Sequence, residues 1–299
     1  MQAFWVVAAA FFFATMAVGI KMAASHYGTA ELLFYRGLVS MVFMAVVMRA
    51  QGVSLVTRLP LMHLWRNVVG VISMASFFYA VAHLPIATAI TLNYMNGVWI
   101  ATFMLGGALL YGRSQRHGTL IMTVLASFAG VVLMLRPSLD AVQMFAGLVG
   151  LLSGLTSALA MLQVTALGKA GEPEARIVFY FSVGSMLAGL LVASLQGFTP
   201  LAEVPWQTTI WLLPIGVMAS LGQWCMTRAY SRGSTLLVAN LQYIGVIFGS
   251  VYSLWLFDDH IAWMSWLGMA LIVVSAISAT LLRARDVPKT AAIALPRST

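Results

Sequence analysis

Two segments of the chain carry amide and aromatic side chains in the middle of otherwise apolar runs. Asn93, Asn96 and Trp99 follow one another at three-residue spacing, and Asn240 and Tyr243 lie in the second segment. Residues three apart share one face of a helix. Amides both donate and accept hydrogen bonds, and indole and phenol rings stack on apolar groups or attract an ammonium. These residues predict a binding face for a small zwitterion; the alternative is that the amides bond between helices and the rings fill the core.

Five further residues are candidates for the same cavity, and they are Tyr79, Thr156, Gln163, Gln223 and Trp224. Tyr79 falls near the end of its apolar run, where a ring either gates an opening or lies in the lipid interface. A threonine in a helix can also bond to a carbonyl of its own helix. We expect these side chains to face the substrate, with ordinary helix packing as the alternative.

The sequence contains no pattern that supports catalysis, a metal or a cofactor. All eight carboxylates lie at the ends of apolar runs, in loops or in the C-terminal tail, so none is placed deep enough to carry protons as in a multidrug antiporter. The single cysteine and the five histidines form no metal-binding cluster. The histidines all lie at or beyond the ends of apolar runs, where we expect water to reach them. No HExxH, G-x-S-x-G or phosphate-binding loop occurs. We expect no enzymatic activity, no metal and no cofactor.

The helices that must hold these side chains have the composition of membrane spans. The chain is 61% apolar and only 8% charged, against about 25% charged in soluble domains, which excludes a water-soluble globule. A span needs roughly 20 apolar residues. Ten uncharged runs near that length occur, at 4–20, 32–48, 65–82, 86–110, 119–135, 145–167, 177–195, 208–230, 236–257 and 262–282. The net charge of +8 is spread singly between these runs, so a nucleic-acid partner is not expected.

The basic residues predict the orientation of the chain. With the N-terminus inside, 13 of the 16 Lys and Arg residues, Arg66 among them, fall on the cytoplasmic side, where short loops retain positive charge. Lys21, Arg36 and Arg136 remain outside. Arg36 lies one turn inside its run, so we expect its long side chain to reach the headgroups or Glu31; attraction of a substrate carboxylate is the alternative.

Glycines and one proline predict where helices approach closely and where one bends. Gly150 and Gly154, and likewise Gly245 and Gly249, form GxxxG pairs that are typical of tight helix packing. Pro214 lies well inside the eighth run and predicts a kink there.

The two halves of the chain resemble each other at an offset of about 148 residues. Lys21 and Lys169 each close the first span of a half, and Gly97 and Gly245 each precede Val in the fourth span. Each half holds five spans, an odd number, so the second half crosses the membrane in the opposite direction. We therefore expect an all-α membrane protein with two inverted five-helix repeats, 1–137 and 143–283, a binding site between them, and a disordered cytoplasmic tail at 284–299.

Short motifs along nearly the whole chain resemble the drug/metabolite transporter superfamily, specifically its EamA-type members. The motifs are GIK at 19–21, ELLFYRG at 31–37, AVAHLPIATA at 80–89, AYSRGSTLLVANLQYIG at 229–245 and LWLFDD at 254–259, where Asp258 takes the family's acidic position. The first half departs from the family pattern, because Arg113 stands where the family usually has Glu and the fourth span lacks the common proline. The resemblance implies ten helices in two five-helix repeats and a transport function.

Within that superfamily the chain is most similar to bacterial inner-membrane exporters of aromatic and other neutral amino acids. The resemblance implies a multi-pass protein with both termini in the cytoplasm that exports an amino acid or a similar metabolite by alternating access. Its partners would be a small-molecule substrate and the lipid bilayer, and a monomer is compatible with the sequence. The absence of a deep titrating group favours facilitated transport. The alternatives are export of another metabolite or drug, such as a nucleobase or a sulfonium compound, and a non-transporting membrane receptor or enzyme.

Overall fold

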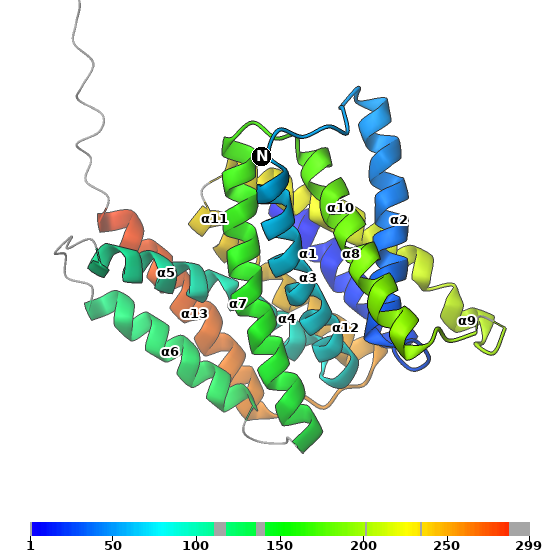
Figure 1. Ribbon diagram of the computed structural model, residues 1–299. Coiled ribbons are helices and arrows are strands. Elements are labelled where there is room, and N and C mark those ends of the chain that lie inside the picture. The colour runs from blue at the N-terminus through cyan, green and yellow to red at the C-terminus, as the bar shows by residue number, and fades with distance from the viewer. Residues whose placement is uncertain (1, 111–117, 136–140, 201, 234, 287–299) are drawn as a thin grey trace, which may run out of the picture.

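The computed structural model describes all residues except 1, 111–117, 136–140, 201, 234 and 287–299, and within that part it contains helices and no strand (Figure 1). The helices are α1 (Gln2–Ala23), α2 (Thr29–Ala50), α3 (Pro60–His83), α4 (Ile86–Tyr94), α5 (Asn96–Leu110), α6 (Gly118–Leu135), α7 (Ala141–Lys169), α8 (Glu174–Gln196), α9 (Trp206–Thr209), α10 (Leu212–Arg232), α11 (Thr235–Leu241), α12 (Ile244–Leu256) and α13 (Trp263–Asp286). The all-α prediction is confirmed for the described residues. The predicted tail lies mostly outside them.

Six helical segments of the described chain are long and apolar enough to cross a membrane. They correspond to α1, α2, α3, α7, α8 and the α9–α10 segment. The other four predicted runs fall on α4 with α5, on α6, on α11 with α12, and on α13. Large apolar side chains cover the outside of the molecule, for example Trp255, which is 86% exposed. Such a surface is stable only when lipid covers it.

Two of the expected spans are interrupted near their middle, where the sequence predicted continuous helices. Met95 separates α4 from α5, and its amide donates to the carbonyls of both Thr91 (3.1 Å) and Leu92 (3.2 Å). Gln242 and Tyr243 separate α11 from α12. A glycine lies two residues after Met95 and two after Tyr243, and glycine weakens a helix by about 1 kcal/mol. Met95 and Tyr243 are 148 positions apart, the offset between the two halves.

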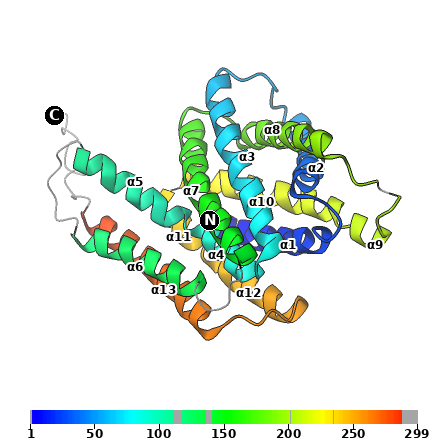
Figure 2. The ribbon, with the colours of Figure 1, turned by 60° about the horizontal axis from the view of Figure 1, so that its bottom comes forward.

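The helices pack mainly in four pairs: α2 with α8, α6 with α13, α3 with α7, and α1 with α10. Figures 1 and 2 place α2 and α8 on one flank of the molecule and α5, α6 and α13 on the opposite flank. The interrupted helices α4, α11 and α12 lie between the flanks (Figure 2). The interruptions are therefore held inside the bundle.

Glycines allow α7 and α12 to approach α4 closely from two directions. A Cβ atom at Gly154 of α7 would collide with the carbonyl oxygen of Leu92, and one at Gly245 of α12 would lie 2.6 Å from the hydroxyl of Tyr94. The close packing predicted from the GxxxG pairs is confirmed. It fixes the end of α4 immediately before Met95.

The kink predicted at Pro214 is present as an interruption one turn earlier. Helix α9 ends at Thr209, Ile210 and Trp211 form a turn, and α10 begins at Leu212. Proline has no N–H to donate to the carbonyl four residues before it, which is that of Ile210, and its ring clashes with that carbonyl in a regular helix.

Candidate substrate-binding site

A cavity of about 60 Å³ is enclosed by α1, α3, α4, α5, α7, α8 and α10 beside the two helix interruptions. Its polar lining consists of Arg66, Ser73, Asn93, Tyr94, Asn96, Ser157, Gln223 and Gln242. Three of the predicted binding residues, Asn93, Asn96 and Gln223, are thus brought together. The rest of the lining is largely Met, Phe, Ile and Ala. An apolar cavity with a few convergent polar groups is the usual form of a small-molecule site.

Asn96 connects the two interruptions by hydrogen bonds. Its Nδ2 donates to the Ser157 hydroxyl of α7 (3.2 Å) and to Oε1 of Gln242 (3.3 Å). Nε2 of Gln242 donates in turn to the hydroxyl of Tyr230 in α10 (2.8 Å). Oδ1 of Asn96 is buried and has no hydrogen-bond partner among the described residues. This oxygen is an acceptor that a substrate can satisfy.

Two buried arginines stack on the same aromatic ring at the edge of the cavity. The Cζ atoms of Arg66 and Arg36 lie 4.1 Å and 4.8 Å from the ring centroid of Phe181, and the two residues are 2% and 0% exposed. Nη1 of Arg36 donates to the Ser185 hydroxyl (3.0 Å). Neither guanidinium forms an ion pair with a described carboxylate, and Nε and Nη1 of Arg66 and Nε and Nη2 of Arg36 are buried without hydrogen-bond partners there. Only Arg66 lines the cavity.

The sequence-based placement of Arg36 was wrong, and the burial of Arg66 was not foreseen. Helix α3 begins at Pro60 and carries Arg66 about 9 Å along the helix at 1.5 Å per residue, where its side chain is buried. Arg36 does not extend to the headgroups or to Glu31. The Glu31 carboxylate accepts instead from the amide of Thr199 (2.6 Å), and burial against α8 leaves Arg36 no path to the surface.

The structure places the remaining predicted binding residues away from the cavity lining, namely Trp99, Tyr243, Tyr79, Thr156, Gln163 and Trp224. The ring of Trp99 stacks on Phe103, with centroids 6.3 Å apart, and Tyr79 stacks on His83 at 4.2 Å. Thr156 donates to the carbonyl of Leu152 in its own helix (2.8 Å). Asn240 lies in α11, and its side chain falls outside the described residues.

Sequence reasoning missed Arg66, Gln242 and Phe181 as residues of the cavity. Gln242 was hidden because the local turn between α11 and α12 changes which face of the segment points inward. For Arg66 a signal was present. Pro60 is favoured at the first position of a helix, and it predicts an earlier start of α3 than the apolar run does.

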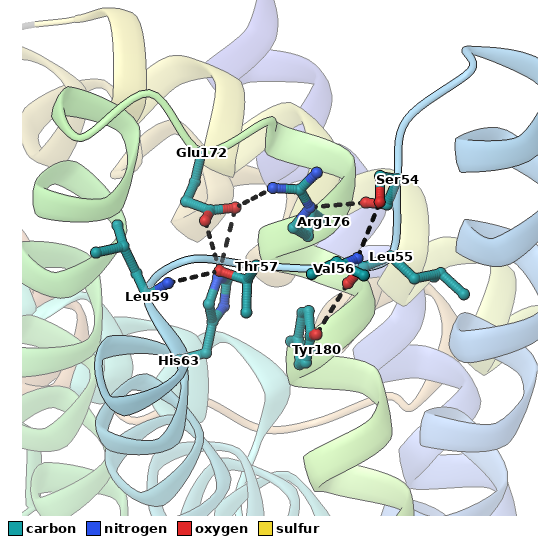
Figure 3. A network of polar contacts seen from close by, with 9 residues as sticks. All are labelled: Ser54, Leu55, Val56, Thr57, Leu59, His63, Glu172, Arg176 and Tyr180. Carbon is teal, nitrogen blue, oxygen red and sulfur yellow. Dashed lines mark hydrogen bonds and ion pairs between the residues drawn. The ribbon is translucent and has the colours of Figure 1, made fainter.

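A second polar cluster joins the α2–α3 loop to the turn between α7 and α8 (Figure 3). The Glu172 carboxylate accepts hydrogen bonds from the Thr57 hydroxyl and from Nη1 of Arg176 (3.0 Å). Nε of Arg176 donates to the carbonyl of Ser54 (2.8 Å). Burial by itself raises the pKa of Glu172. The hydrogen bonds from Thr57 and Arg176 lower the pKa by more than burial raises it, so the pKa lies below its ordinary value. The loop is therefore held in place by a charged carboxylate.

His63 also belongs to this cluster, since its Nε2 lies 3.6 Å from Oε2 of Glu172 and its ring packs on Tyr180 at 4.6 Å (Figure 3). The sequence predicted that histidines at the ends of apolar runs remain open to water. That prediction is wrong for His63, which is 2% exposed, because the 51–59 loop folds over the start of α3.

A separate cavity of about 330 Å³ lies where α1 and α3 end and before α13 begins. Its lining includes Lys21, His83, Asp259 and His260. Nζ of Lys21 pairs with the Asp259 carboxylate at 2.8 Å. The family resemblance assigned the acidic position to Asp258, whose backbone instead adopts a φ of 49°. In this turn Asp259 forms the ion pair, and Asp258 adopts the left-handed backbone conformation.

The curated proteins that the chain resembles are transporters. No protein-family model matches the chain. The chain is 32% identical over 277 residues to the pseudopaline exporter CntI of Pseudomonas aeruginosa, which covers 91% of this chain and 93% of that protein. It is 26% identical to an uncharacterized transporter of Helicobacter pylori, covering 89% of each chain. A protein of known crystal structure shares the fold with a TM-score of 0.67 at 18% identity, over 95% of this chain and 98% of that one.

Proposed function

The chain belongs to the family of membrane transporters that contains the pseudopaline exporter CntI, and from that premise we propose that it exports a small metabolite across a bacterial inner membrane by alternating access. The observation that carries this proposal is the apolar cavity with convergent polar groups beside two interrupted helices. Non-helical backbone at membrane depth is tolerated where it lines a cavity, and transporters place substrate sites at such interruptions.

The packing of the helices supports two inverted repeats, 1–137 and 143–283, as the basis of alternating access. Exchanging α1 with α7, α2 with α8, α3 with α10 and α6 with α13 converts the α1–α10 pair into the α7–α3 pair. The same exchange leaves the α2–α8 and α6–α13 pairs unchanged. This is the pattern of a two-fold axis, and a cavity between two such halves opens to either side as the halves rock.

We further propose that the chain is an EamA-type member of the drug/metabolite transporter superfamily and that its substrate is an amino acid or a compound related to pseudopaline. The ten apolar runs and the similarity to CntI support these two statements. The cavity of about 60 Å³ must widen to admit either substrate, because pockets for drug-sized ligands measure roughly 300–1,000 Å³. In this proposal the cavity widens during the transport cycle to admit the substrate.

A counterflow assay in proteoliposomes tests the transport proposal. Vesicles are preloaded with one unlabelled amino acid from a panel, and the same amino acid is added outside in labelled form. For at least one amino acid of the panel, the label should accumulate transiently inside the vesicles. Asn96→Ala should lower that flux about tenfold, the effect of losing roughly 1.4 kcal/mol of binding. Gln163→Ala is the matched control, since Gln163 lies outside the cavity lining. A folded protein that gives no flux with any compound would favour the receptor or enzyme alternatives.

A further inference from the structure

Resting on the proposed transport function, we propose that the cavity binds its substrate through a carboxylate held by Arg66, and that Arg36 supplies a second positive charge behind Phe181. The substrate class is then a small organic anion rather than a neutral amino acid. The inference starts from charge, because both guanidinium groups are buried and unpaired among the described residues.

Three other cations of the described chain have found carboxylate partners. Lys21 pairs with Asp259, Arg176 with Glu172 and Arg232 with Glu174. All three pairs lie near the ends of helices, where water also reduces the cost of a charge. Arg36 and Arg66, which lie farther inside their helices, lack a carboxylate partner among the described residues. A buried charge without a counter-ion is costly. An anion that enters the cavity can pair with this charge and accept hydrogen bonds from its unpartnered N–H groups.

The position of the Arg66 guanidinium depends on the backbone beside it. A Cβ atom at Gly70, one turn later in α3, would collide with Nη1 of Arg66. The absence of a side chain at Gly70 therefore lets the guanidinium fold along α3 between the helix and the ring of Phe181. Both Arg66 and Gly70 line the cavity, so the charged group borders the space that a ligand would occupy.

The chemistry of the lining favours a carboxylate. Arginine offers five donors in a planar fork that matches carboxylate oxygens, and it has no acceptor. None of the described carboxylate side chains lines the cavity, so the ammonium of a zwitterion would find no counter-ion among them. Oδ1 of Asn96 supplies an acceptor for a hydroxyl or amide of the same substrate. A dicarboxylate therefore suits the two positive charges better than a neutral amino acid does.

The test uses the purified full chain and two probes of the same shape, the dicarboxylate glutarate and its neutral diamide glutaramide. Glutarate should raise the melting temperature of the protein, and glutaramide should not. Arg66→Gln should abolish the glutarate shift, whereas Arg66→Lys, which keeps the charge, should retain part of it. Arg228→Gln is the matched control, because Arg228 also stacks on an aromatic ring, that of Trp5 at 4.6 Å, but does not line the cavity.

Several results would overturn the inference. They are no shift with glutarate, an equal shift with glutaramide, or a shift that survives in Arg66→Gln. A shift with inorganic phosphate as large as that with glutarate would replace the carboxylate assignment by a general anion site. Counterflow separates this inference from the transport proposal. Flux of neutral amino acids at the wild-type rate in Arg66→Gln refutes the anion site alone, whereas glutarate binding without flux of any compound refutes transport alone.

Discussion

A buried guanidinium without an anion costs several kcal/mol of desolvation, and stacking on one ring returns only about 0.5–2 kcal/mol. Arg66 is in this situation, because no described carboxylate pairs with it and its ring contact is with Phe181. Arg66→Met should therefore raise the free energy of unfolding by on the order of 1 kcal/mol, which is measured as a higher melting temperature without added anion. An arginine that serves only to hold helices together would give the opposite sign, and a lower melting temperature would show this.

Glu172 should contribute to stability through its bonds to the α2–α3 loop. Glu172→Gln weakens hydrogen bonds to a charged acceptor, and we expect a loss of about 1.5–3 kcal/mol and faster amide exchange at residues 54–59. Glu174→Gln is the matched control, because its partner Arg232 has a side chain that is 60% exposed and surface pairs contribute little. Equal losses in the two variants would contradict a special role for Glu172.

The pH dependence of stability follows from the lowered pKa of Glu172. A carboxylate whose pKa is lower in the folded state stabilises fully above the unfolded pKa, about 4.3. That contribution is lost as the pH falls through the folded pKa. The melting temperature of the wild type should fall more steeply below about pH 4 than that of Glu172→Gln. Parallel curves for the two proteins would contradict the assignment.

At the residue scale the sequence revealed part of the cavity. Asn93 and Asn96 were identified because amides at three-residue spacing in an apolar run are costly in lipid unless they face a cavity or a polar partner, and Gln223 was identified on the same ground. Trp99 follows the same spacing and lies in α5 with Asn96, but its ring packs on Phe103 and Phe128 instead of lining the cavity. Three-residue spacing therefore did not by itself separate a side chain that lines the cavity from one that packs against neighbouring rings.

At the scale of helices, the approach of α7 to α4 should be intolerant of any side chain. Gly154→Ala places a methyl group against the Leu92 carbonyl, and the overpacking should cost about 1–3 kcal/mol. It should also disturb the bond from Asn93 to the Ser153 hydroxyl (3.0 Å) and lower transport. Gly106→Ala is the control.

A Cβ atom at Gly106 in α5 meets no other atom within 4 Å. Alanine should be neutral there, or stabilising by up to about 1 kcal/mol, through helix propensity alone. Melting temperatures of the two variants and their counterflow rates give the comparison. Similar behaviour of the two alanine variants would mean that α4 and α7 are not held as closely as the structure places them.

The helix boundaries show which elements the sequence can and cannot predict. Apolar length located the six long segments within a few residues, because the bilayer thickness sets that length. It did not reveal the breaks at Met95 and at Gln242, since the residues on both sides of each break are equally apolar. The end of α4 before Met95 is packed against α7 and α12, which are distant from it in sequence.

At the scale of the whole molecule, both termini should lie in the cytoplasm. Even when the buried residues Arg66 and Arg36 are left out of the count, 12 cytoplasmic charges stand against 2 outer ones. The asymmetry remains strong, and it sets orientation through short loops. A reporter that works only in the cytoplasm should be active when fused after Thr299. Activity of a periplasmic reporter at that position would reverse the predicted orientation.

An anionic substrate also changes the energetics of export. Export moves negative charge out of a cell whose interior is negative, and each net charge gains about 2.3 kcal/mol per 100 mV, which corresponds to a gradient of about fiftyfold. Such a carrier needs no proton-carrying carboxylate, and the described residues that line the cavity include none. Efflux of glutarate from proteoliposomes should therefore accelerate when a potassium gradient with valinomycin makes the lumen negative, and slow when the potential is reversed. Glutaramide efflux, if measurable, should not respond to the potential. Glutarate efflux that is indifferent to the potential would mean that two positive charges leave with each glutarate dianion, and the buried pair of Glu172 and His63 would then be the first place to look for a proton carrier.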